Sequence, residues 1–187
     1  MNIHQLSVNY EDRQDRLLLR VNTQGGQEYR LWLTRRLTGR LLPHLQTCVV
    51  QLETLNPQVM VTDASAQQML TELKRETFLQ KADFQTPFTS QDPTLPLGQE
   101  PILVTDVQLN LQNNGTLNVV FQDKSGNDAT QRSCQLGLQS SLLHGLLHLI
   151  DQALQKANWC MEPVPASRAQ QETVQEETHA ARPTYTH

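Results

Sequence analysis

Apolar and polar residues alternate with a period of two in three stretches near the N-terminus, as they do in strands buried on one face. The apolar faces of these stretches are Leu6, Val8 and Tyr10; Leu17, Leu19 and Val21; and Tyr29, Leu31 and Leu33. Gly25 and Gly26 lie between the second and third stretches and suit the positive φ angles of a hairpin turn. Because short links join consecutive strands, we predict an antiparallel three-stranded meander.

The period then changes to 3.6 residues, which predicts an amphipathic helix from Arg35. Its apolar positions are Leu37, Leu41, Leu42, Leu45, Val49 and Leu52. Thr34 is a suitable N-cap, and Asn56 and Pro57 end the helix. Pro43 lies inside it and is expected to kink it, or to divide it into a first turn and a longer second piece.

A second helix is predicted from about Ala64 to Lys81, with Thr62 or Asp63 as its cap. Its apolar face is narrow and consists of Met69, Leu70, Leu73 and Phe78. Residues 85–101 are rich in proline and poor in aliphatic side chains, so we predict an extended linker. Phe84 and Phe88 are the candidates to pin this linker to the body of the protein.

The opening pattern returns from Ile102. Asn113, Asn114 and Gly115 form a strong turn signal between the first two alternating stretches. The apolar faces here are Val107, Leu109 and Leu111; Leu117, Val119 and Phe121; and Cys134, Leu136 and Leu138. A Leu-rich helical pattern follows from about Ser141 and stops near Trp159.

The two halves superimpose by their apolar positions. At the third strand and the helix the offset is 105 residues: Leu31 onto Leu136, Leu33 onto Leu138, Leu37 onto Leu142, Leu41 onto Leu146, Leu42 onto Leu147 and Leu45 onto Ile150. At the first strand the offset is 101 residues, and a longer second hairpin turn accounts for the difference. We therefore predict an internal duplication in an α+β fold, in which two repeated antiparallel meander-plus-helix units pack together with an extra helix between them.

The predicted organisation has five parts. Residues 1–57 and 102–162 are the two meander-helix units, 58–84 the connecting helix, 85–101 the Pro-rich linker and 163–187 a disordered tail.

Composition changes this picture little. The chain has 187 residues, no apolar run long enough to span a membrane, and polar or charged residues throughout its first sixteen positions. Its three cysteines, Cys48, Cys134 and Cys160, are odd in number and never spaced as C-x-x-C. We interpret them as small apolar side chains in a reducing compartment, and we expect a cytoplasmic location and no contact with membranes.

Charge is distributed unevenly along the chain. The net charge of −4 argues against a general nucleic-acid binder, because phosphate contact favours a basic surface. Residues 1–55 nevertheless carry seven arginines against five acids. Any anion-facing surface is therefore expected in the first half.

The outer face of the first meander is the main candidate for binding. If its leucines point inward, Arg20, Arg30 and Trp32 point outward together, and Arg35, Arg36 and Arg40 begin the following helix. An exposed tryptophan among arginines suits stacking on single-stranded bases with neutralisation of phosphates. The alternative is structural: Trp32 packs against the other unit or a second subunit while the arginines pair with Glu28, Glu53 and Asp15.

No residue pattern indicates catalysis or a cofactor. His144, His148 and Asp151 share one helix face at a spacing that a metal ion can use, but an H-E-x-x-H motif and further ligands are missing. We interpret them as an exposed polar face and predict no metal ion, no cofactor and no enzymatic activity.

The repeated meander-plus-helix order resembles, at the level of fold only, the single-stranded nucleic-acid-binding proteins of the whirly and Pur-repeat type. Their units usually have four strands, whereas three are clear in this sequence, and the acidic balance also differs. Our leading hypothesis is a non-enzymatic binding or assembly protein. It engages another protein or a second copy of itself through the first meander's outer face and the helix at 64–81. The alternative is a single-stranded DNA or RNA binder.

Overall fold

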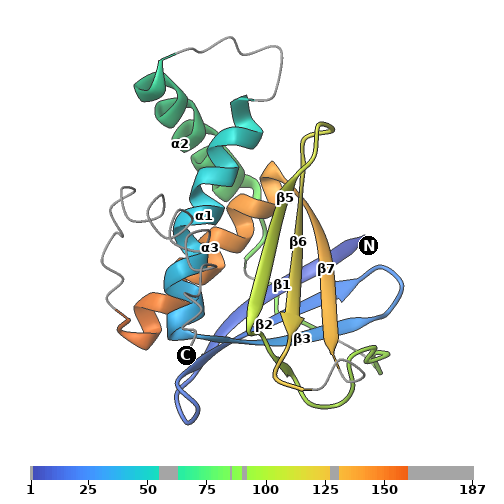
Figure 1. The fold of residues 1–187 in the computed structure, drawn as a ribbon. Helices are drawn as coiled ribbons and strands as arrows, with labels where there is room; N and C mark the ends of the chain where they lie inside the picture. Colours follow the sequence, from blue (N-terminus) through green and yellow to red (C-terminus); the bar gives the residue numbers. More distant parts are fainter. Residues whose placement is uncertain (1, 55–62, 85, 90–91, 127–130, 160–187) are drawn as a thin grey trace, which may run out of the picture.

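The computed structural model describes residues 2–54, 63–84, 86–89, 92–126 and 131–159. These residues form a mixed α+β structure with two antiparallel meanders, each followed by a helix (Figure 1). In chain order the elements are β1 (Ile3–Glu11), β2 (Arg16–Thr23), β3 (Glu28–Thr34), α1 (Arg35–Thr54), α2 (Ala64–Lys81), β4 (Ile102–Leu103), β5 (Asp106–Leu111), β6 (Thr116–Asp123), β7 (Arg132–Gln139) and α3 (Ser140–Ala157). The predicted fold class is confirmed.

The strands form two sheets. The first has the order β1-β2-β3-β4, in which β4 is a short parallel addition to β3, and the second has the order β5-β6-β7. The turn glycines lie where the sequence predicts them: Gly26 has φ 72° between β2 and β3, and Gly115 has φ 75° between β5 and β6. A side chain at either position would be strained, because L-residues rarely adopt positive φ.

Corresponding residues are paired across the strands of the two meanders. In the first sheet Val8 pairs with Leu19, which pairs in turn with Leu31. In the second sheet the corresponding row is Leu109, Val119 and Leu136. These rows keep the offsets of 101 and 105 residues found between the apolar positions of the sequence. The duplication itself stays a prediction.

One hydrophobic core fills the space between the two sheets and the helices. The two sheets lie one over the other with their strands crossing (Figure 1). Helices α1 and α3 lie side by side next to the sheets. The packing is reciprocal, since α3 contacts β1 of the first sheet while α1 contacts β5 and β6 of the second. Each sheet is therefore covered in part by the helix that follows the other meander.

Local capping explains where the helices begin and end. The hydroxyl of Thr34 accepts a hydrogen bond from the Leu37 amide at 3.2 Å, and the Asp63 carboxylate accepts one from the Ala66 amide at 3.0 Å. Asn158, with φ 51°, ends α3 in the left-handed conformation. Helix α1 continues through Pro43, so the expected division into two pieces does not occur.

The segment between α2 and β5 runs back across the first sheet. Phe84 packs against Phe78 and His148, with ring centroids 6.4 and 4.8 Å apart respectively. Farther along, Thr94 pairs with the strand edge at Gln27, and β4 then pairs with β3. The segment therefore occupies the free edge of the first sheet.

None of the described helices has the length and apolarity that a membrane crossing requires. The predicted disordered tail and Cys160 lie outside the described residues.

Candidate functional site

The outer face of the first sheet holds three of the predicted binding residues. Arg20 and Arg30 lie directly opposite each other on β2 and β3, and Trp32, half-buried, lies opposite Leu18. Trp32 therefore points away from the core, as the sequence predicts.

The two arginines are engaged by their own sheet. The Nε atoms of Arg20 and Arg30 lie 2.9 and 2.7 Å from the same carboxylate oxygen of Glu28, whose side chain is completely buried. This contact agrees with the alternative given above, in which the arginines pair with acidic residues of the protein itself. Glu53 and Asp15, the other two expected partners, instead contact Lys74 and Tyr10.

The connecting segment covers part of this outer face. The guanidinium of Arg20 lies 4.2 Å from the centre of the Phe88 ring, in cation–π geometry. The side chains of Gln5 and Asn22 donate hydrogen bonds to the carbonyls of Pro87 and Thr89, at 3.1 and 2.7 Å. Residues 87–89 therefore cover part of the approach to Arg20, whose side chain remains 26% exposed.

The remaining predicted residues, Arg35, Arg36 and Arg40, lie in the first two turns of α1. All three are exposed, and none forms an ion pair with another residue that the structure describes. Cations in a first turn oppose the helix dipole by a few tenths of a kcal/mol. These three arginines are therefore available to an anion, whereas the Nε atoms of Arg20 and Arg30 are already engaged by Glu28.

Helix α2 turns two of the four residues of its predicted apolar face outward. Met69 is 73% exposed and Leu73 is 60% exposed, and no other large apolar side chain among the described residues is comparably exposed. Only Leu70 and Phe78 of the predicted face turn toward the body, and Thr71 is the buried residue of this helix. Residues at i and i+4 share a face, so Met69 and Leu73 form one patch.

The three helices meet at a buried carboxylate. Glu53, near the end of α1, is 5% exposed. It accepts a hydrogen bond from the ammonium of Lys74 on α2 and lies 3.3 Å from Nε2 of His144 on α3. The interpretation of His144 as part of an exposed polar face is wrong, because its side chain is 3% exposed. Helical periodicity places His144 beside His148, but it does not tell which helix covers them.

Electrostatics at this junction favour the charged carboxylate. Burial by itself raises the pKa of Glu53, but hydrogen bonds from His144, Lys74 and Ser140 together with the positive charge of Lys74 outweigh it. The resulting pKa is about 2.

Asp151, two turns farther along α3, is half-buried and lies near Arg75 and His148. Burial raises the pKa of this carboxyl, and the charges of Arg75 and His148 offset part of the rise. No group of three or more His, Cys, Asp or Glu residues in the described part of the chain has a geometry suited to a metal ion.

No family model, no curated protein and no solved structure matches the chain. The resemblance to whirly and Pur-repeat proteins therefore rests only on the order of the elements. Each meander of this chain has three strands, and the fourth strand of the first sheet is a parallel addition from the connecting segment.

Replacing Glu28 tests the account of the outer face. In Glu28→Gln, Arg20 and Arg30 remain opposite each other without a negative charge between them, and like charges in this position repel. Since the two arginine side chains are 26% and 29% exposed, we expect a loss of about 1–3 kcal/mol in the free energy of unfolding, measured in urea by tryptophan fluorescence. The exposed control Glu76→Gln is expected to stay within about 0.5 kcal/mol of wild type. Equal stabilities of the two variants would contradict this account.

The Glu53 junction predicts a specific dependence of stability on pH. Because the pKa of Glu53 falls from 4.5 to about 2 on folding, its contribution is complete above about pH 5 and is lost as the pH falls toward 2. The shift corresponds to at most about 3 kcal/mol. Denaturation of wild type and Glu53→Gln between pH 2 and 7 is expected to show a shallower acid loss in the variant, while Glu76→Gln keeps the wild-type slope. An unchanged slope in Glu53→Gln would refute this role.

Proposed function

We propose that this protein acts by association rather than by catalysis, and that it binds a second copy of itself through the outward face of α2. The observation that carries the proposal is the exposure of Met69 and Leu73 on one helix face. Exposed apolar side chains that lie together on a surface are typical of interaction sites. The other exposed residues of this face, Ser65, Glu76 and Gln80, form a polar border.

The way α2 is attached supports this proposal. Apart from Thr71, the helix turns only partly buried side chains toward α1 and α3, so packing within one molecule uses little of its surface. Phe78 reaches Gly145 of α3, where an added Cβ would lie 3.3 Å from the phenylalanine ring. The inner side of α2 is thus held closely at one end, while the outer side remains open to a partner.

Charge selects an antiparallel arrangement of two α2 helices. With the pair centred on Thr71, between the two apolar residues, Glu72 comes opposite Leu70 and Glu76 opposite Ala66. The two Glu72 residues lie two positions apart, and each is paired with Arg75 of its own helix. The same arrangement brings Asp63 at the start of one helix near Lys81 at the end of the other, with opposite charges. A parallel pair would place like charges side by side.

Introducing a charge into the patch tests this interface. Leu73→Glu places a carboxylate in the proposed contact, so we expect a decrease of tenfold or more in the association constant, since desolvating an unpaired charge is unfavourable. The measurement is size-exclusion chromatography with light scattering over a range of concentrations. Gln51→Glu, on the exposed surface of α1, makes the same change of charge elsewhere and is expected to associate like wild type. A wild-type protein that stays monomeric at all concentrations would refute the interface.

The second candidate function is binding of single-stranded nucleic acid. It is favoured by one observation, the exposure of Arg35, Arg36 and Arg40 without ion pairs among the described residues. Trp32, at the end of β3 that leads into α1, would supply the stacking surface. Arg20 and Arg30 contribute less in this version, because both hold the carboxylate of Glu28, which offsets one of their two positive charges.

A salt titration with an unstructured oligonucleotide separates this candidate from the first. If phosphates are bound by the exposed arginines, Arg36→Ala/Arg40→Ala is expected to weaken binding and to reduce the salt dependence, whereas Trp32→Ala weakens binding and leaves the salt dependence unchanged. Arg132→Ala, in the second unit, is the control. No measurable binding of the wild-type protein at low salt would eliminate the nucleic-acid function.

A further inference from the structure

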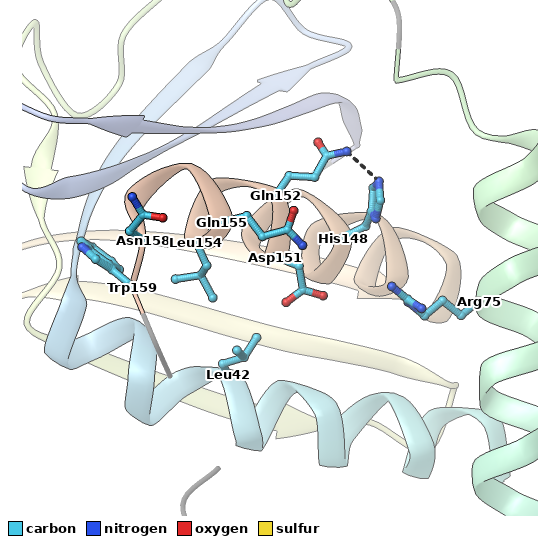
Figure 2. Close-up of a pocket in the computed structure, with 9 residues that line it drawn as sticks. All are labelled: Leu42, Arg75, His148, Asp151, Gln152, Leu154, Gln155, Asn158 and Trp159. Carbon is cyan, nitrogen blue, oxygen red and sulfur yellow. Dashed lines mark hydrogen bonds between the residues drawn. The ribbon is translucent and has the colours of Figure 1, made fainter. Parts of the chain in front are cut away.

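The segment that joins α2 to β4 is anchored at both ends. At its start, Phe84 packs against His148, which lines a cavity of about 720 Å³ on the inner side of α2. Figure 2 shows His148 on α3 beside Gln152, whose amide nitrogen lies 3.0 Å from the imidazole Nε2. At the other end, β4 pairs with β3, and its Ile102 is completely buried. The residues between these anchors can therefore be displaced without unfolding a helix or a strand.

Between these anchors, residues 86–89 lie on the outer face of the first sheet. The side-chain amide of Gln5 on β1 binds their backbone twice, since it donates a hydrogen bond to the Pro87 carbonyl at 3.1 Å and accepts one from the Thr89 amide at 3.3 Å. Asn22 on β2 donates to the Thr89 carbonyl at 2.7 Å. These backbone groups point to one side of an extended chain. Two side-chain amides of the sheet thus hold a backbone in contacts that do not depend on its side chains.

Phe88 adds an aromatic contact to these backbone contacts. Its ring centre lies 4.2 Å from the guanidinium of Arg20, and Glu28 holds the other side of this guanidinium at 2.9 Å. Next to Arg20 on the same face, Leu18 and Trp32 lie directly opposite each other and are half-buried. The outer face therefore offers amides for a backbone, a fixed guanidinium for an aromatic ring, and an apolar pair beside them.

The sheet holds this internal segment weakly. None of the described residues from 82 to 101 is buried, and Thr86, Pro87 and Thr89 are exposed. Segments with few buried contacts open at a low cost in free energy. A competing chain that offers the same backbone groups and an aromatic ring can therefore replace residues 86–89.

We infer that the outer face of the first sheet binds an extended peptide that carries an aromatic residue, and that residues 86–89 occupy this site as an internal ligand. The incoming peptide takes over the contacts of the internal segment. Gln5 and Asn22 bind its backbone, and Arg20 lies against its aromatic ring. The inference does not depend on self-association, because Met69 and Leu73 lie on α2 and not on this sheet.

Fluorescence anisotropy with a labelled peptide of residues 85–92 tests the competition. In wild type the internal segment competes at the high effective concentration of a tethered ligand. Phe88→Ala removes the ring contact from the internal segment, so the full-length variant is expected to bind the peptide at least threefold more tightly than wild type. Gln99→Ala, at an exposed position of the same segment, is expected to bind like wild type. Equal affinities of wild type and Phe88→Ala would overturn the inference.

A second peptide tests the chemistry of recognition. The same peptide with the change Phe88→Ala is expected to bind at least threefold more weakly to any one of these proteins, because it lacks the ring that Arg20 contacts. Both peptides have the same backbone and charge. Equal binding of the two peptides, or no saturable binding of either to the Phe88→Ala protein, would overturn the inference.

Side-chain amide resonances locate the site. Addition of the peptide to the Phe88→Ala protein is expected to shift the ¹H–¹⁵N resonances of the Gln5 and Asn22 side chains, whereas Gln108, exposed on the outer face of the second sheet, stays unchanged. Unchanged resonances of Gln5 and Asn22, or equal shifts at Gln108, would contradict the assigned position. An oligonucleotide that binds Phe88→Ala more tightly than wild type, while the peptide binds neither, would assign this face to nucleic acid and overturn the inference.

Discussion

The Glu53 carboxylate is a buried charge at which three helices meet. An ionised carboxylate removed from water is strongly unfavourable unless charges and hydrogen bonds replace its hydration. Here one partner comes from α2 and the other from α3, so the charged form is stable only when all three helices are in place. Helix α2 has no fully buried apolar side chain, so this contact, together with Phe78 against Gly145, helps to determine its position. The outward patch of α2 and the inner cavity both follow from that position.

Most of the fold was predictable because its signals are local. Alternation in the strands, the turn at Gly26 and the cap at Thr34 each depend on a few neighbouring residues. The short parallel strand β4 was not predictable, since two residues carry no period and their partner strand lies about seventy positions earlier. The rule that proline interrupts a helix also failed to predict that α1 continues through Pro43. Packing along the rest of the helix outweighs one lost hydrogen bond.

The candidate surfaces were predictable only in part, since they depend on contacts between distant segments. The outward direction of Trp32 follows from strand alternation. Its neighbour Arg20, however, is covered by Phe88, which approaches from a segment with no regular pattern. The burial of His144 depends on where α1 ends and α2 packs, and the exposure of Leu73 depends on which side of α2 meets the other helices. A helical wheel gives the relative directions of side chains but not their neighbours.

The parallel pairing of β4 with β3 also affects how the protein is made. During synthesis the first meander leaves the ribosome long before residues 94–103, so the outer edge of β3 stays unpaired while about seventy further residues are added. An unpaired strand edge is a site for association between nascent chains. The Trp32 carbonyl, which later accepts a hydrogen bond from the Val104 amide at 3.0 Å, belongs to that edge. A pause in translation before residue 104 would therefore prolong the time during which this edge is unpaired.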